Sequence, residues 1–145
     1  MCYLFRLQDH AARFRGAIES CDKSDLPPTF MDFPRGSCGD ASLLLAKFLE
    51  ESGFGLFNYF LGEQNENSHA WLENGDVVVD ITADQFPDMP DSVVVARNSK
   101  WHLAFCGEFQ HVANFDNYDK NTRLTLLSAY FTILKHVEYQ DESYF

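Results

Sequence analysis

The dipeptide Asn74-Gly75, between two apolar segments, is the feature that most constrains the fold of this chain. Asn and Gly tolerate the positive φ angles of a two-residue type I′ turn, and together they are the strongest short-range signal of a β-hairpin. We therefore expect residues 67–73 and 76–82 to pair as antiparallel strands. Such a turn sets a register in which Glu73 faces Asp76, and every further pair keeps the same sum of residue numbers.

This register places His69 directly opposite Asp80. Side chains that face each other across antiparallel strands have Cβ atoms about 4.5–5.5 Å apart, within reach of a carboxylate–imidazole hydrogen bond. A carboxylate in that position fixes the tautomer of the imidazole and stabilises its protonated form, as in a nucleophilic triad. Asp84 is the alternative acid if the hairpin slips or contains a bulge.

Both faces of the hairpin are apolar, which indicates a strand pair inside the sheet. A His and an Asp buried there can satisfy each other's hydrogen bonds. Trp71 is interpreted as core packing, with contact to a substrate as the alternative. Trp71 and Val78 share the face of His69, and the other face carries Ala70, Leu72, Val77 and Val79.

Cys38 begins the segment with the clearest helical pattern, which continues to about Ser52 and ends at Gly53. We interpret Ser37 as the N-cap of this helix and Asp40 as the acidic residue of a capping box. The partial positive charge at a helix N-terminus lowers the pKa of a thiol placed there. The backbone amide of Cys38 is free of the helix and is suited to bind the oxyanion of a tetrahedral intermediate.

The remaining segments complete an α+β fold, with helices at both ends of the chain around a mostly antiparallel sheet. The length fits a single domain over residues 1–145. Further elements are expected as helices at 3–20 and 121–137, a loop at 22–36, and strands at 55–62, 93–95 and 101–112.

The charge of the chain excludes several classes of function. The formal net charge is −11, which argues against binding to nucleic acid or to an anionic membrane, because both attract a surplus of Lys and Arg. An acidic surface favours a basic substrate segment. No apolar run is long enough to cross a membrane and the first residues lack a signal-peptide core, so we expect a cytoplasmic protein.

The four cysteines form no CxxC pair. Without an export signal, disulfides are not expected, and the spacing matches neither a zinc ribbon nor a thioredoxin motif. Removal of Met1 would expose Cys2 as an N-terminal nucleophile, but the residues that follow indicate a helix. No cofactor is expected.

Two groups of residues are alternative metal sites. His102, Cys106 and His111 match no standard ligand spacing, and on one strand His111 would lie on the opposite face from the other two. Cys38, His69 and Asp80 could together hold a catalytic zinc with an open position. A thiol at the start of a helix favours a nucleophile instead, so we expect no metal.

The segments around Cys38 and His69 resemble those of a known superfamily. Gly36-Ser37-Cys38-Gly39-Asp40-Ala41 is similar to the nucleophile helix of transglutaminase-like cysteine peptidases, and Ser68-His69-Ala70-Trp71-Leu72-Glu73 with Val79-Asp80 is similar to their His and Asp segments. The order Cys, His, Asp matches as well, and the resemblance covers roughly residues 34–86. Asp32 stands at the sixth position before Cys38, where a papain-type enzyme carries Gln, so the second oxyanion donor stays unassigned.

The resemblance implies a papain-like (transglutaminase-like) fold, with the nucleophile helix packed on the sheet and Cys38 in contact with His69. It also implies a cysteine-dependent hydrolase, a thiol protease or amidase that cleaves a peptide or small amide or thioester through an acyl-enzyme, as leader peptidases of the superfamily do. Acyl transfer to an amine and glutamine deamidation are alternatives, and so is a catalytically silent interaction module. Arg35 is either a substrate contact or a surface charge.

Overall fold

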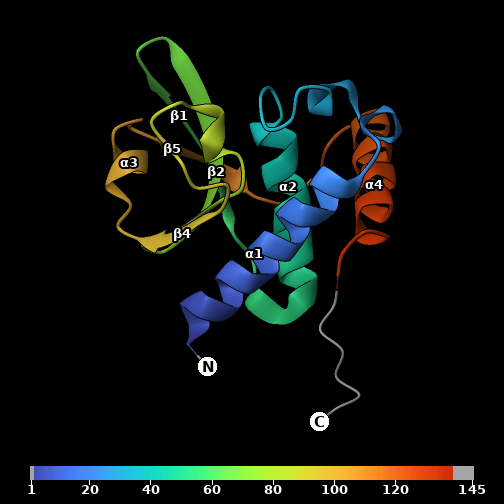
Figure 1. The fold of residues 1–145 in the computed structure, drawn as a ribbon, viewed down its shortest axis with the longest axis horizontal. Helices are drawn as coiled ribbons and strands as arrows, with labels where there is room; N and C mark the ends of the chain where they lie inside the picture. Colours follow the sequence, from blue (N-terminus) through green and yellow to red (C-terminus); the bar gives the residue numbers. More distant parts are fainter. Residues whose placement is uncertain (1, 139–145) are drawn as a thin grey trace.

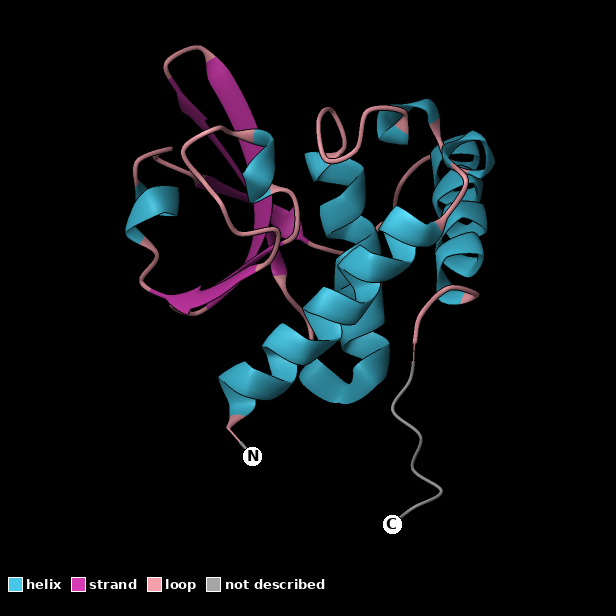
Figure 2. Cartoon of the chain, viewed as in Figure 1, coloured by secondary structure: helices cyan, strands magenta, loops and turns pink. Residues whose placement is uncertain are grey.

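The computed structural model describes residues 2–138. Within this range a five-stranded antiparallel sheet stands beside a group of helices (Figures 1 and 2). The long helices pack on one face of the sheet, and the short helix α3 (Lys100–Leu103) lies on the other side (Figure 1). The prediction of an α+β fold is therefore confirmed.

Helices α1 (Tyr3–Ser20) and α2 (Cys38–Leu49) follow the apolar patterns of the sequence, and α2 begins at Cys38 as expected. In α4 (Lys120–Leu134) the buried face is a different one, because Leu124 and Phe131 of the expected pattern are exposed. α2 gives way to a π-helical turn, η3 (Glu50–Phe54), in which Gly53 adopts a φ of 92° that favours glycine. The remaining helical elements are the 3₁₀ segments η1 (Lys23–Asp25), η2 (Pro28–Phe30) and η4 (Ala83–Gln85).

The sheet has the strand order β4-β3-β2-β1-β5, so β2, which carries His69, is its central strand. The expected strand over residues 101–112 is only half correct, because its first part forms α3. Ser99 starts that helix by accepting a hydrogen bond from the amide of His102. The strands are β1 (Asn58–Gln64), β2 (Asn67–Asn74), β3 (Val77–Asp80), β4 (Val94–Arg97) and β5 (Glu108–Val112).

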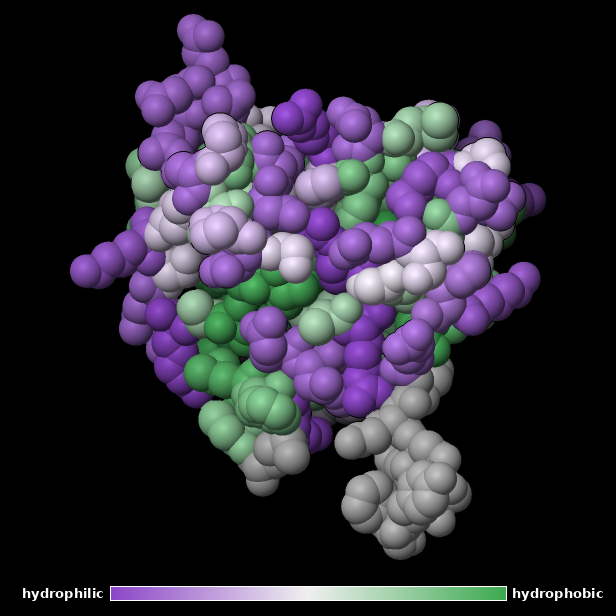
Figure 3. Space-filling model, in the orientation of Figure 1, coloured by the Kyte–Doolittle hydropathy of each residue, from purple (hydrophilic) through white to green (hydrophobic). Residues whose placement is uncertain are grey.

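Apolar side chains fill both faces of the central hairpin, as the sequence predicts. The larger cluster includes Leu72 and Val79 and fills the space between the sheet and the long helices. Trp71, Val78 and Phe105 form a smaller cluster on the opposite face. The outer surface in Figure 3 is mostly hydrophilic, with hydrophobic side chains gathered near its middle. No helix in the described part is long and apolar enough to cross a membrane.

The register of the central hairpin differs from the expected one. Val77 pairs with Asn74 and Val79 pairs with Leu72, so the loop is Gly75-Asp76 and not Asn74-Gly75. Gly75 has a φ of 60°, and Gly at the first loop position is typical of a type II′ turn. The expected pairing of His69 directly opposite Asp80 is therefore wrong. Because the shift is even, every side chain keeps its predicted face.

The start of α2 also differs from the expected capping box. The Ser37 hydroxyl donates to the carbonyl of Pro34 at 3.0 Å and makes no cap to the helix. The Asp40 carboxylate accepts a hydrogen bond from the Thr29 hydroxyl at 2.7 Å. Both side chains thus tie the helix to the preceding loop, and they leave the amides of its first turn free of side-chain caps.

Candidate active site

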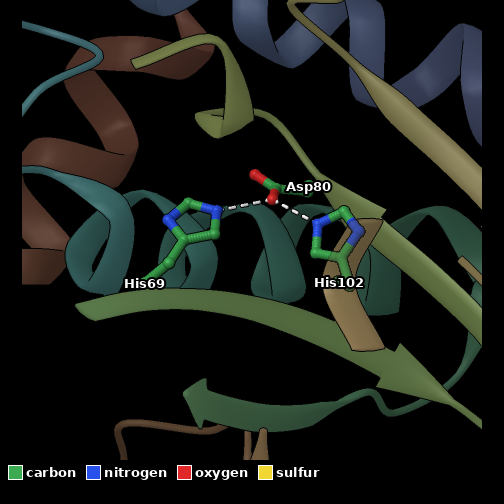
Figure 4. A group of neighbouring side chains, drawn as sticks. All are labelled: His69, Asp80 and His102. Atoms are coloured by element: carbon green, nitrogen blue, oxygen red, sulfur yellow. Dashed lines mark hydrogen bonds and ion pairs between the residues drawn. The ribbon is translucent and has the colours of Figure 1, made fainter. Parts of the chain in front are cut away.

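His69 and Asp80 meet as predicted, although they lie diagonally across the hairpin. His69 Nε2 lies 2.6 Å from Asp80 Oδ2, and both side chains are buried (Figure 4). Diagonal neighbours on one face remain within reach of a long side chain, which is how the contact survives the two-residue change in register. The contact makes Nε2 the protonated ring nitrogen of neutral His69. Its Nδ1 is then the nitrogen that can act as a base.

A second histidine, His102 of α3, completes the group around Asp80. His102 Nε2 lies 2.7 Å from the same Oδ2 atom, on the side opposite His69 (Figure 4). Its other nitrogen, Nδ1, lies 2.6 Å from the hydroxyl of Ser99. The Oδ1 atom of Asp80 accepts a hydrogen bond from the amide of Thr82 at 2.8 Å. The carboxylate is therefore fixed from three directions.

Asp80 is ionised in this environment. Burial alone would raise the pKa of this carboxyl, but the hydrogen bonds from His102 and His69 outweigh it and hold the pKa well below its usual range. A buried carboxylate with these donors is a permanent negative charge at neutral pH. It stabilises a positive charge on the neighbouring His69.

Cys38, at the first position of α2, lies beside His69 on strand β2. Burial would raise the pKa of the Cys38 thiol, but the interactions with His69 and the backbone amide of Ala70 lower it overall. Among the described residues, the short hydrogen bonds of the His69 ring go to Asp80 and Gln85, so its contact with Cys38 is the looser one. Nucleophile–base pairs are often loose before a substrate binds.

The charge balance of the pair favours a thiolate beside an imidazolium. Burial lowers the pKa of His69, but the interactions with Asp80 and with Cys38 raise it to about 9. The pKa of the Cys38 thiol is thus lowered and that of the His69 imidazole is raised, and both changes favour the charged pair. This is the arrangement in which a cysteine is activated as a nucleophile.

Gln85, in η4, is a site residue that the sequence did not identify. Its Nε2 atom lies 3.0 Å from His69 Nδ1, the nitrogen that is not bound to Asp80. The amide donates to Nδ1 while the imidazole is neutral, and it has to turn when that nitrogen becomes protonated. Gln85 therefore competes with the thiol of Cys38 for the base.

An aromatic wall closes the other sides of His69, which has no exposed surface. The rings of Trp71, Phe86, Trp101 and Phe105 lie with centroids between 5.2 and 5.8 Å from its own. Such a wall excludes water and strengthens the electrostatic interactions inside it. Cys38 is partly exposed whereas His69 is not, so solvent reaches the pair from the Cys38 side.

The alternative acid, Asp84, belongs to a different structure. Its two carboxylate oxygens accept hydrogen bonds from Arg15 of α1 at 2.7 and 3.0 Å. Arg15 also donates to the carbonyl of Ile81 at 2.7 Å. Asp84 thus anchors the segment after β3 to α1, and the structure does not bring it to His69.

The expected alternative metal site is not formed. His102 is bonded to Asp80, whereas His111 lies 2.9 Å from the hydroxyl of Tyr118, and Cys106 is exposed. Among the described residues, the one group with metal-ligand composition is His69, Asp80 and His102. Its N–O separations of 2.6 and 2.7 Å are those of hydrogen bonds, because ligands of one tetrahedral zinc ion lie about 3.3 Å apart.

The two expected substrate contacts lie in different surroundings. Trp71 is 1% exposed and donates through Nε1 to Glu73 at 2.7 Å. It lines a cavity of about 380 Å³ beside His102, and Cys38 is not among the residues that line this cavity. Arg35 is exposed on the loop before α2. Neither location decides whether the residue contacts a substrate, so both substrate contacts stay predictions.

Comparison with known proteins identifies no relative of this chain. No family model matches it, and neither a curated protein nor a solved structure does.

Proposed function

We propose that this chain is a cysteine-dependent acyl-transfer enzyme with a transglutaminase-like, papain-like fold. Cys38 is the nucleophile, His69 is the base, and Asp80 orients and charges the base. The observation that carries the proposal is the chain of contacts from Cys38 to His69 and from His69 to Asp80. A helix-terminal thiol lies beside a histidine whose far nitrogen is bound 2.6 Å from a buried carboxylate.

The reaction begins with attack of the Cys38 thiolate on a carbonyl carbon. A carbon–sulfur bond forms, and the π electrons of the carbonyl move to its oxygen, where the backbone amide of Cys38 donates a hydrogen bond. When the intermediate collapses, the bond to the leaving group breaks and His69 gives its Nδ1 proton to that group. The product of this half-reaction is a thioester on Cys38.

Release of the acyl group uses the same residues in reverse order. His69 takes a proton from water, the resulting hydroxide attacks the thioester, and Cys38 leaves as the thiolate. An amine in place of water gives acyl transfer. Asp80 keeps Nε2 protonated throughout, and His102 holds Asp80 through the opposite side of the same oxygen.

Hydrolysis of a peptide or another amide is the preferred reaction. It is supported by the resemblance to leader peptidases, and the net charge of −11 suits a basic substrate segment. Transfer to an amine and deamidation of glutamine use the same acyl-enzyme. They differ only in the acceptor or in the amide that is attacked.

A catalytically silent interaction module is the second candidate. The observation in its favour is the burial of His69, which has no exposed surface. A base in that position serves catalysis only through Nδ1, next to the partly exposed Cys38. In a silent module the same His–Asp–His group would be a buried hydrogen-bond network that stabilises the sheet.

Acylation by p-nitrophenyl acetate distinguishes the two candidates. The enzyme hypothesis predicts an acetyl group on Cys38, located by peptide mass spectrometry, and its loss in His69→Ala. Cys2 is the matched control, because it is the N-cap of α1 and has a lowered pKa from backbone hydrogen bonds, but His69 does not contribute to that shift. Equal acetylation of Cys2 and Cys38, unchanged in His69→Ala, would support the silent module.

A further inference from the structure

Tyr59 of β1 projects toward the first turn of α2. A Cβ atom added to Gly39 would lie 2.9 Å from the Tyr59 hydroxyl oxygen, so this oxygen lies against the residue that follows Cys38. The strand partner of Tyr59 is Leu72, which faces the helices. Glycine at position 39 is what leaves room for the hydroxyl group.

The ring of Tyr59 is held in place by its neighbours. It stacks on the imidazole of His111 with a centroid distance of 5.1 Å and an interplanar angle of 9°. The Nε2 atom of His111 is bonded in turn to the hydroxyl of Tyr118 at 2.9 Å. A donor that is fixed before the reaction needs no reorganisation when charge develops near it.

The hydroxyl group of Tyr59 has no hydrogen-bond partner among residues 2–138. Burial raises the pKa of Tyr59 to about 12, and the negative charges of Cys38, Tyr118 and Asp40 add to this effect. The group therefore stays protonated at neutral pH and is free to donate. The contribution of Cys38 also shows that the thiolate lies near this hydroxyl.

The backbone of α2 offers a second donor at the same place. The first amide with an acceptor inside the helix turn is that of Ala41, which donates to the Ser37 carbonyl at 2.8 Å. The amide of Cys38 precedes it and belongs to the orphan donors of the helix start. A carbonyl oxygen bound at Cys38 would thus meet this amide and lie close to the Tyr59 hydroxyl.

We propose that the Tyr59 hydroxyl is the second oxyanion donor, together with the backbone amide of Cys38. This inference rests on the proposed acyl-transfer function. When the thiolate attacks, the π electrons of the carbonyl move to its oxygen and the hydroxyl donates a hydrogen bond to it without giving up its proton. When the intermediate collapses, the carbonyl re-forms as the leaving group departs, and the hydrogen bond weakens.

The test compares two reactions of Cys38 in Tyr59→Phe, which keeps the ring stacked on His111. Acylation by p-nitrophenyl acetate builds an oxyanion, whereas alkylation by iodoacetamide is a displacement at a saturated carbon and builds none. Loss of one oxyanion donor is expected to slow acylation on the order of 10²-fold. Alkylation and its pH profile are expected to stay as in the wild type.

Gly39→Ala supplies an independent variant, because its methyl group would push the Tyr59 hydroxyl away without altering the thiol. It is expected to slow acylation in the wild-type background but to have no further effect in Tyr59→Phe, where the hydroxyl is already absent. This loss of effect in the double variant ties both changes to one atom. Circular dichroism of each variant confirms that it folds.

Three outcomes would contradict the inference. Acylation of Tyr59→Phe within about threefold of the wild type would remove Tyr59 from the oxyanion site. Equal slowing of acylation and alkylation would show that the hydroxyl acts on the resting thiolate instead. If wild-type protein releases no more p-nitrophenol than Cys38→Ala, the proposed function itself fails, and the inference fails with it.

Discussion

Replacing Asp80 with Asn removes the charge that holds His69 protonated while keeping the size of the side chain. In the native site, Oδ2 accepts from His69 and His102, and Oδ1 accepts from the amide of Thr82. An asparagine has one carbonyl oxygen, which can replace either Oδ2 or Oδ1 but not both. Its NH₂ group then faces a donor on the other side, so the buried group is left partly unsatisfied.

The effect on His69 can be estimated from its raised pKa. The site raises this pKa from 6.5 to about 9, and a difference of about 2.5 pH units corresponds to about 3.4 kcal/mol in favour of the imidazolium. Asp80 contributes more than Cys38 to the rise, and burial opposes it. We therefore expect Asp80→Asn to lower the pKa of His69 by more than about 1.3 units.

The assay is an NMR titration of the His69 imidazole, assigned by comparison with His69→Gln. Asp84→Asn is the matched control, because Asp84 binds Arg15 and does not contact His69. His69 in this control is expected to titrate as it does in the wild type. A His69 pKa that stays above about 8.5 in Asp80→Asn, or one that falls equally in Asp84→Asn, would refute the reasoning.

Three further predictions concern Gln85, Trp71 and the loss of stability at low pH. Gln85→Ala removes a donor that stabilises the neutral His69, so the alkylation rate of Cys38 at pH 6–7 should rise; an unchanged or lower rate contradicts this. Trp71→Ala should lower the free energy of unfolding, measured with urea, by about 3–5 kcal/mol because the ring is buried; a loss below about 1 kcal/mol contradicts it. The lowered pKa of Asp80 stabilises the fold above the ordinary value of 3.8, and this contribution is lost as pH falls through the lower folded value. Unfolding free energies measured between about pH 4 and pH 2 should therefore fall more steeply in the wild type than in Asp80→Asn.

The central hairpin shows what local sequence determines. The alternation around Asn74-Gly75 correctly predicted two buried strands and the faces of their side chains, because both depend on neighbouring residues alone. It did not determine which residues occupy the two loop positions, because Gly75 suits a type I′ or a type II′ turn. The contact between His69 and Asp80 survived because an error of two residues changes no face.

The local sequence does not predict the residues that other elements bring to His69 and Asp80. His102 lies 22 residues after Asp80 and Gln85 lies 16 residues after His69, and no local pattern reports contacts at such separations. The sequence indicates His102 only as a candidate metal ligand on an expected strand. The short helix α3, set by Ser99, turns it toward Asp80 instead. Ser37 and Asp40 have the sequence of a capping box, but both side chains bond to the segment before α2 instead.

The most direct test of the account is the pH dependence of iodoacetamide alkylation at each cysteine, in the wild type and in His69→Ala. A thiolate–imidazolium pair predicts that Cys38 reacts well below the ordinary thiol pKa of about 8.5 and loses this advantage without His69. Cys2, whose pKa is lowered mainly by backbone hydrogen bonds at the start of α1 and not by His69, should keep its profile in both proteins. A Cys38 that is no more reactive than the buried Cys21, or that is unchanged in His69→Ala, would contradict the central claim.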